Sequence, residues 1–231
     1  MARKFIIFRF LCAAAIATLL GVACDRPDRP EGPQYLDPDH VRVVVTPGSG
    51  AGFGSVERIY GPPSSTSSGG TLDVLSLGNG GEIVIDLGDR VLVDGPGSDF
   101  IVHENPFYAG GDPNNPYAEV AIVAVSQDGT TYFTFSFDYD PSGKTVRERF
   151  VGFAGIDPAG DRFDLADVGL SWARFIRISD AGIQRDDSPT PAIRDNDDQF
   201  LDDPGNLCCG GTSQGFDLDA ITLLHLGSRP K

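Results

Sequence analysis

Acidic and amide side chains gather in the segment DGPGSDFIVHENPF, which runs from Asp94 to Phe107. A Gly-Pro turn presents Asp94 and Asp99, and a short apolar run then leads to Glu104 and Asn105. Calcium binds six to eight oxygen atoms, which come from carboxylates, amides and carbonyls. The segment therefore predicts a calcium site for which these four residues are candidate ligands.

Glu104 stands out within this segment because of the residues that share its face. Alternation along a strand places Phe100, Val102 and Glu104 on the same side. An ionised carboxylate at the end of an apolar row needs a partner. A bound cation would supply that partner.

The segment QGFDLDAITLL, residues 214–224, supplies a second pair of acids. Strict alternation places Asp217, Asp219, Ile221 and Leu223 on one face, so both carboxylates share it with apolar residues. Residues i and i+2 of a strand are about 6.6 Å apart, so the two aspartates can lean toward one ion. The alternative is that each aspartate caps a turn or accepts hydrogen bonds from neighbouring amides.

Strands must position these acids, because short apolar runs separated by Gly, Pro, Asp and Ser dominate the chain. No window shows a helical apolar stripe, and residues 163–170 are at most a helical turn. We expect an all-β fold, an antiparallel β-sandwich of jelly-roll type with long Gly- and Asp-rich loops at 138–162 and 180–214. The expected strands are 41–45, 72–77, 82–87, 99–104, 119–126, 131–137, 173–179 and 216–224.

Two of these runs carry sharper expectations about which residues face the core. In TYFTFSF, alternation predicts that Phe133, Phe135 and Phe137 face one way. The run at 119–126 is apolar on both faces, which predicts an interior strand.

Catalytic patterns are weak. Residues 211–215, GTSQG, fit G-x-S-x-G, but a nucleophile elbow needs a strand before the serine and a helix after it. Here a loop precedes the serine and a strand follows. None of His40, His103 and His225 accompanies an obvious nucleophile and acid, so we expect no enzyme.

A hydrolase acting on glycans through a carboxylate pair is the alternative. Glu104 would act with Asp99 or Asp217 as acid and base. A purely structural component of the cell envelope is a further alternative.

The N-terminus predicts export. Arg3, Lys4 and Arg9 precede an apolar stretch and small residues up to Cys24, as in a secretory signal. LLGVAC is similar to a bacterial lipoprotein signal, and the resemblance implies cleavage before Cys24 and its acylation, which would anchor the chain in the outer membrane or at the cell surface. The position three residues before the cysteine, usually branched in such signals, is Gly21. Ordinary secretory cleavage near Ala23 is the alternative.

The chain divides into four parts. They are a signal peptide at 1–23, the lipidated cysteine and a Pro-rich tether at 24–40, one β-sandwich domain at 41–227, and a tail at 228–231. The net charge of −15 argues against nucleic acid as a partner and suits divalent cations or neutral ligands. We expect a monomer.

Two further pairs of residues could contribute to function. Cys208 and Cys209 would meet an oxidising compartment, and we predict a vicinal disulfide, with free thiols or a bridge to another chain as alternatives. Tyr108 and Tyr117 flank the AGGDPNNP loop and are candidates for a platform on which a sugar ring stacks.

Several segments together resemble a group of bacterial cell-surface proteins and lipoproteins related to those with PEP-CTERM sorting tails. They are TPGSGAGFG, LDVLSLGNGGEIVIDLG, VDGPGSDFIVHENPF, AEVAIVAVSQDGTTYFTF, FDLADVGLSWARFIRISD and GFDLDAITLL. The similarity spans most of residues 43–224. The chain departs from that group by ending in HLGSRPK instead of a sorting tail.

More distantly, ARFIRI followed by a DLDAI final strand is similar to galactose-binding-like sandwiches of the discoidin and carbohydrate-binding-module type. That resemblance implies a structural calcium, with Glu104 or Asp99 as early ligands and Asp219 or Asp217 as late ones. It also implies a glycan or a surface protein as partner. We therefore expect a calcium-stabilised, non-catalytic binding or surface-display lipoprotein.

Overall fold

The computed structural model describes residues 32–64, 72–108, 111–117, 119–181 and 215–229. The predicted signal peptide, Cys24 and the Cys208-Cys209 pair lie outside these residues, as does most of the 180–214 loop. No helix in the described part of the chain is long and apolar enough to cross a membrane.

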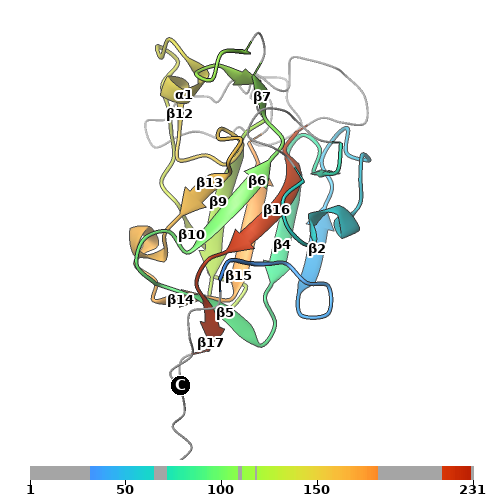
Figure 1. Ribbon diagram of the computed structural model, residues 1–231, viewed down its shortest axis with the longest axis vertical. Helices are drawn as coiled ribbons and strands as arrows, with labels where there is room; N and C mark the ends of the chain where they lie inside the picture. Colours follow the sequence, from blue (N-terminus) through green and yellow to red (C-terminus); the bar gives the residue numbers. More distant parts are fainter. Residues whose placement is uncertain (1–31, 65–71, 109–110, 118, 182–214, 230–231) are drawn as a thin grey trace, which may run out of the picture.

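Two five-stranded antiparallel sheets form the body of the molecule (Figure 1), which confirms the all-β prediction. The first sheet has the order β1-β16-β6-β13, with β3 also paired to β16. Its strands are β1 (Gln34–Tyr35), β3 (Leu75–Ser76), β6 (Phe100–Glu104), β13 (Asp161–Phe163) and β16 (Asp217–Leu223). The second sheet has the order β10-β9-β15-β4-β2. Its strands are β2 (Arg42–Thr46), β4 (Glu82–Asp86), β9 (Ala121–Ser126), β10 (Phe133–Thr134) and β15 (Phe175–Asp180).

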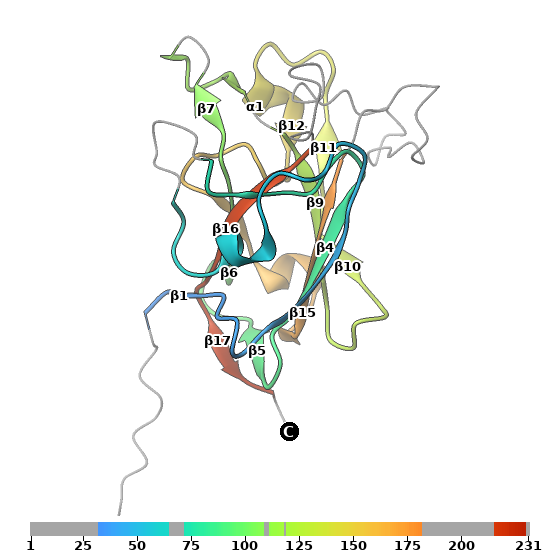
Figure 2. The same cartoon turned by 90° about the vertical axis from the view of Figure 1, so that its right-hand side faces the viewer.

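The two sheets pack face to face, and Figure 2 shows β6 and β16 on one side with β4 and β15 on the other. Alternation in β4 buries Ile83 and Ile85, which contribute to one apolar cluster together with Phe100 and Val102 of β6. Strand β9 pairs with β10 on one side and β15 on the other, so it is interior as predicted. Burial of these alternating apolar faces is the main force that holds the sandwich together.

Small elements close the two ends. At the lower end of Figure 1 lies a three-stranded sheet of β14 (Trp172–Ala173), β5 (Arg90–Val93) and β17 (Leu226–Ser228). At the upper end lie the hairpin of β7 (Phe107–Tyr108) and β8 (Pro116–Tyr117) and the pair β11 (Asp138–Tyr139) and β12 (Phe150–Val151), with α1 (Val146–Arg149). The 3-10 helices η1 (Val56–Ile59) and η3 (Leu165–Val168) lie between strands, and η3 confirms the short helical turn expected there.

Two expectations about local structure are wrong. The phenylalanines of TYFTFSF do not share a face, because β10 ends at Thr134: Phe133 is 41% exposed while Phe135 is in the core. The predicted tether also extends too far, since β1 pairs with β16 and Leu36 is 2% exposed in the core. The folded part of the chain therefore includes residues 34–36.

Candidate functional site

The four candidate ligands between Asp94 and Asn105 do not form one site. Strand β6 begins directly after Asp99 and ends at Glu104. At about 3.3 Å per residue, five residue steps separate the two carboxylates by about 16 Å. Asp94 and Asp99 therefore lie at the lower end of the sandwich, whereas Glu104 and Asn105 lie at the upper end. The compact site that the spacing suggested is wrong, because an extended strand holds its two halves apart.

Asp99 links three segments at the lower end through hydrogen bonds to its carboxylate. It is fully buried, and its carboxylate accepts hydrogen bonds from the backbone N–H of Gly95 (2.8 Å) and of Leu165 (2.7 Å). The Nδ1 atom of His225 donates a third, at 2.8 Å. Single carboxylate oxygens of Asp94, Asp99 and Asp164 lie within 4.8 Å of one another. Asp99 already accepts three of the roughly four hydrogen bonds that a carboxylate can take, which leaves it little capacity to bind an ion.

The upper end holds a cluster of buried carboxyl groups. Glu104 is 3% exposed, Asp217 is 7% exposed and Glu119 is 9% exposed. Burial raises the pKa of Glu104 well above its usual range, and the charges of Glu119, Asp217 and Asp161 raise it further. The N–H of Asn105 opposes this shift through a hydrogen bond to Glu104. We call Glu104, Glu119 and Asp217, together with the half-buried Asp161, the carboxylate cluster.

Strand pairing brings the carboxylate cluster together from distant parts of the sequence. Glu104 is the last residue of β6 and lies beside Leu218 of β16, next to Asp217. Asp161 opens β13 and pairs with Val102. Glu119 comes shortly before β9, where its carbonyl packs against Gly155 so closely that a Cβ there would lie 2.1 Å from the oxygen. Gly155 has a φ of 98°, which favours glycine as well.

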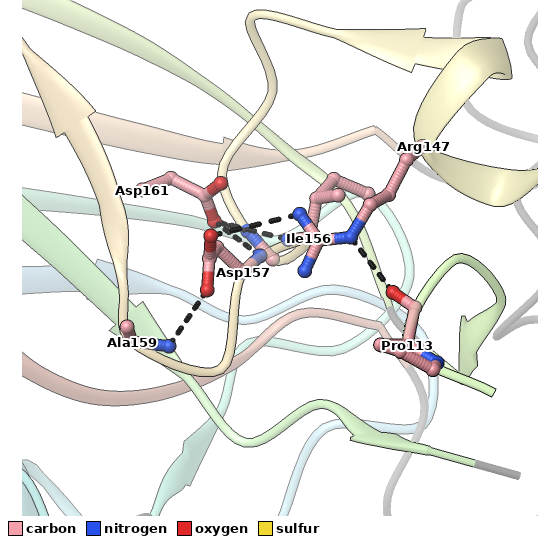
Figure 3. A network of polar contacts seen from close by, with 7 residues as sticks. Pro113, Arg147, Ile156, Asp157, Ala159 and Asp161 are labelled. Atoms are coloured by element: carbon pink, nitrogen blue, oxygen red, sulfur yellow. Dashed lines mark hydrogen bonds and ion pairs between the residues drawn. The ribbon is translucent and has the colours of Figure 1, made fainter. Parts of the chain in front are cut away.

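Asp161 is fixed by a network of polar contacts, shown in Figure 3. Its Oδ2 atom accepts hydrogen bonds from the N–H groups of Gly155 (2.8 Å), Ile156 (3.0 Å) and Asp157 (3.3 Å). Asp157 forms an ion pair with Arg147 at 3.6 Å, and Arg147 Nε donates to the carbonyl of Pro113 at 2.8 Å. Burial nevertheless raises the pKa of Asp161 to about 6, since its three amide donors only partly offset it. The network ties α1 and the 111–117 segment to the edge of the cluster.

Asp217 is the member of the carboxylate cluster with the clearest unsatisfied polar atom. Its side chain is bonded to Ser76, yet its buried Oδ1 atom has no hydrogen-bond partner among the described residues. Burial raises its pKa to about 6. A buried, unsatisfied carboxylate oxygen is costly unless it is protonated or coordinated. Carboxylate oxygens are hard ligands of the kind that Ca²⁺ prefers. Among the described residues, however, the acids that place three ligand atoms within 4.8 Å of one another are Asp94, Asp99 and Asp164, not the members of the carboxylate cluster.

Asp219 turns to a different environment from Asp217. The register of β16 shifts between Leu218 and Ala220, which interrupts the alternation that the sequence predicted. As a result Leu218 shares the core with Ile221. Asp219 accepts hydrogen bonds from the N–H (3.0 Å) and the Oγ–H (2.7 Å) of Ser64. The expectation that both aspartates share the face of Ile221 is therefore wrong, because one extra residue in a strand reverses the faces beyond it.

The two aromatic candidates lie on the upper hairpin. Tyr108 pairs with Pro116 and Tyr117 pairs with Phe107, and both tyrosines are half-buried. Their role as a sugar platform stays a prediction.

A cavity of about 410 Å³ opens at the lower end, where no sequence pattern had pointed. It lies between the start of β2, the turn after β4 and the residue before β15. A second cavity of about 120 Å³ shares lining residues with the first. A third, of about 150 Å³, shares lining residues with the second and reaches β17. The residues that line the 410 Å³ cavity are Pro38, Asp39, His40, Val41, Arg42, Leu87, Gly88, Asp89, Arg90 and Arg174.

The fold and these two regions define an antiparallel β-sandwich with a buried carboxylate cluster at one end and a polar cavity at the other. No protein-family profile matches the sequence, and no curated protein matches it. The resemblance to PEP-CTERM-related proteins therefore stays a prediction.

Three solved structures show a low level of similarity to the chain. One is a family 89 glycoside hydrolase from Clostridium perfringens in complex with 2-acetamido-1,2-dideoxynojirmycin: 14% identity, TM-score 0.41, with 83% of this chain and 15% of that chain covered. The second is the C-terminal domain of a chitobiase from Bacteroides fragilis: 14% identity, TM-score 0.38, with 85% and 100% covered. The third is CBM32-3 from a family 31 glycoside hydrolase of Clostridium perfringens: 9% identity, TM-score 0.35, with 83% and 94% covered. Likenesses at this level assign neither a function nor a ligand to this chain.

Proposed function

We propose that this chain is a non-catalytic binding protein of the bacterial cell envelope, that calcium stabilises it, and that it recognises a saccharide. The observation that carries the binding part is the polar cavity of about 410 Å³ at the lower end. Cavities of roughly 300 to 1,000 Å³ are typical of small-molecule sites.

The chemistry of the cavity lining suits sugar hydroxyl groups. Arg42 and Arg174 can only donate hydrogen bonds, whereas ionised Asp39 and Asp89 can only accept them. A hydroxyl group does both, so a ring that carries several hydroxyls can satisfy both kinds of residue at once.

The absence of catalysis is proposed from the burial of the carboxyl groups that a hydrolase would use. Glu104 and Asp217 are 3% and 7% exposed, so a glycosidic bond has no room between them. Asp99, the other partner considered, lies at the opposite end of β6. A glycoside hydrolase needs two carboxyl groups that flank an accessible sugar.

Saccharide binding can be tested with the mature chain on an array of neutral and acidic oligosaccharides, followed by calorimetry. We expect at least one saccharide class to bind, and Asp39→Trp to abolish binding because the indole fills the cavity. The matched control is Val44→Trp, at a 63% exposed position on β2 outside the cavity, which should bind as the wild type does. Binding that survives Asp39→Trp would contradict the assignment to this cavity.

Attachment to the envelope is proposed from the sequence around Cys24, which lies outside the described residues. Cells that express the chain and are fed labelled palmitate should incorporate the label into it, and Cys24→Ala should remove all of the label because the acylated thiol is gone. Cys208→Ala is the matched control and should keep the label. A Cys24→Ala chain that stays labelled would show that another residue is acylated.

A further inference from the structure

We propose that the lower cavity selects a saccharide that carries a carboxylate, such as a uronic acid unit. The inference rests on the proposed function and adds the chemical class of the ligand. The chain as a whole has 18 Lys and Arg residues against 33 Asp and Glu residues. Three arginines nevertheless meet in this one cavity, from positions 42, 90 and 174.

Arg174 is held in a fixed direction by Asp86. Its Nε atom donates to Oδ1 of Asp86 at 2.6 Å, and its Nη2 atom donates to Oδ2 at 2.8 Å. The guanidinium also lies over the ring of Phe175, at 5.1 Å from the ring centroid. This arrangement leaves Nη1 on the side away from Asp86, and no residue in the described ranges bonds to it. A donor that is already immobilised loses little entropy when a ligand binds.

Arg42 adds a second guanidinium beside the same carboxylate. It pairs directly with Asp86 across β2 and β4, and its charge lowers the pKa of Asp86 together with that of Arg174. Beyond this backbone pairing, the side chain of Arg42 makes no hydrogen bond or ion pair within the described part of the chain. Asp86 therefore interacts with both arginines, and the charge of Asp89 acts on Arg174 as well. The donors that remain are the side chain of Arg42 and Nη1 of Arg174, and a ligand carboxylate can accept paired hydrogen bonds from them.

The acidic residues of the cavity restrict how such a ligand can lie. Asp39 and Asp89 are exposed, and they would repel a carboxylate placed next to them. The favourable orientation directs the ligand carboxylate to Arg42 and Arg174 and its hydroxyl groups to the two aspartates. The mixed lining thus distinguishes an acidic sugar from a free anion such as phosphate, which has no hydroxyl groups to offer at the second position.

The adjoining cavity extends the site. It shares His40, Val41, Leu87 and Arg90 with the first cavity and is also lined by Tyr35, which is 37% exposed. Arg90 is oriented by Gln34, whose side-chain carbonyl accepts from Nη1 at 2.6 Å. An aromatic face beside the first cavity suits a second sugar ring, so oligosaccharides are better probes than single sugars.

The test compares oligomers of galacturonate, mannuronate and glucuronate with the same oligomers after methyl esterification, which removes the charge and keeps the ring. Calorimetry with the mature chain at a fixed free calcium concentration should give at least one acid that binds about tenfold tighter than its ester, as expected for a charge-assisted hydrogen bond. Arg42→Gln and Arg174→Gln should each weaken binding of that acid about tenfold and change binding of the ester much less.

Arg229→Gln is the matched control, because Arg229 lies over Trp172 outside the cavity and its loss should not affect binding. Arg42 is exposed, so Arg42→Gln keeps the test valid even where Arg174→Gln impairs folding through the loss of its pair with Asp86. Equal affinity for acid and ester, or stronger binding of a sulfated oligosaccharide, would overturn the inference and leave the proposed function intact. Failure of every saccharide to bind would overturn both.

Discussion

Addition of calcium to the metal-free chain at pH 7 should raise its midpoint of thermal unfolding by roughly 5 to 10 °C. A ligand at about 100 times its Kd stabilises the folded state by about 2.7 kcal/mol, and a domain of this size shifts by about 2 to 4 °C per kcal/mol. The expected effect is large because the ion would neutralise the mutual repulsion of Glu104, Glu119 and Asp217 and satisfy the buried Oδ1 atom of Asp217. Thermal unfolding followed by circular dichroism, with and without chelator, measures it.

Substitutions within the carboxylate cluster show where the ion binds. Glu104→Gln and Asp217→Asn should each abolish the calcium response, because an amide keeps the shape of the side chain and removes the charge. The matched control is Asp94→Asn, which alters an exposed acid at the lower end and should retain the full response. Loss of the response in Asp94→Asn alone would place the ion beside Asp99 instead. An unchanged midpoint in the wild type would refute calcium stabilisation altogether.

The main features of the fold could be predicted because they follow from the pattern of apolar residues within each strand. Apolar alternation in EIVIDL predicts that Ile83 and Ile85 face the core, and both have no exposed surface. The same rule identified Glu104 at the end of the row of Phe100 and Val102, where the structure confirms that it is buried. Because successive side chains of a strand point to opposite faces, the buried face of each strand can be predicted from its own residues alone.

The composition of the carboxylate cluster could not be predicted in the same way. Glu119 and Asp161 reach Glu104 only through the pairing of β13 with β6 and the course of the chain before β9, which depend on contacts between distant residues. The only local signal for the cluster was that Glu119 opens an otherwise apolar run.

No local pattern in the sequence predicts the bulge between Leu218 and Ala220. A single inserted residue was enough to separate Asp219 from Asp217.

The lower cavity could be predicted from local sequence even less than the carboxylate cluster. Arg42, Arg90 and Arg174 are separated by 48 and 84 positions in the sequence, and no motif links them. Their common location follows from the antiparallel order of β2, β4 and β15, in which Asp86 pairs with Arg42 on one side and with Phe175 on the other. The acidic residues are abundant and gather in short segments, whereas the basic residues are scarce and dispersed, so no local pattern marks the cavity.

In the absence of calcium, the difference in stability between the wild type and Asp217→Asn should grow as the pH rises. Burial raises the pKa of Asp217 to about 6, above its usual value of 3.8. Its contribution to stability is therefore fully present below pH 3.8, where the group is protonated in both states, and is lost as the pH rises through 6. The amide in the variant cannot ionise, and its oxygen can still accept a hydrogen bond from Ser76. We expect nearly equal stability at about pH 3.5 and an advantage of about 3 kcal/mol for the variant at about pH 7.5.

Titrating groups that do not interact with Asp217 affect both proteins equally, whereas the charge of Asp217 raises the pKa of Glu104. The difference between the two proteins therefore measures Asp217 together with its effect on Glu104. Burial lowers the pKa of His103 below 6.5, so the folded state loses stability as the pH falls below that value. This pH dependence is opposite in direction to that of Asp217, whose contribution is lost as the pH rises. Burial would raise the pKa of Asp86, but hydrogen bonds outweigh it, and the lowered pKa values of Asp86 and Asp128 affect stability only below about pH 4.

Urea unfolding of metal-free protein at several pH values from about 3.5 to 7.5 gives the two curves. Saturating calcium should reverse their order at the highest pH, because coordination stabilises the ionised carboxylate of the wild type and the variant has none to offer. Parallel curves in metal-free buffer would mean that Asp217 is already compensated, which would remove the reason for a cation at the upper end.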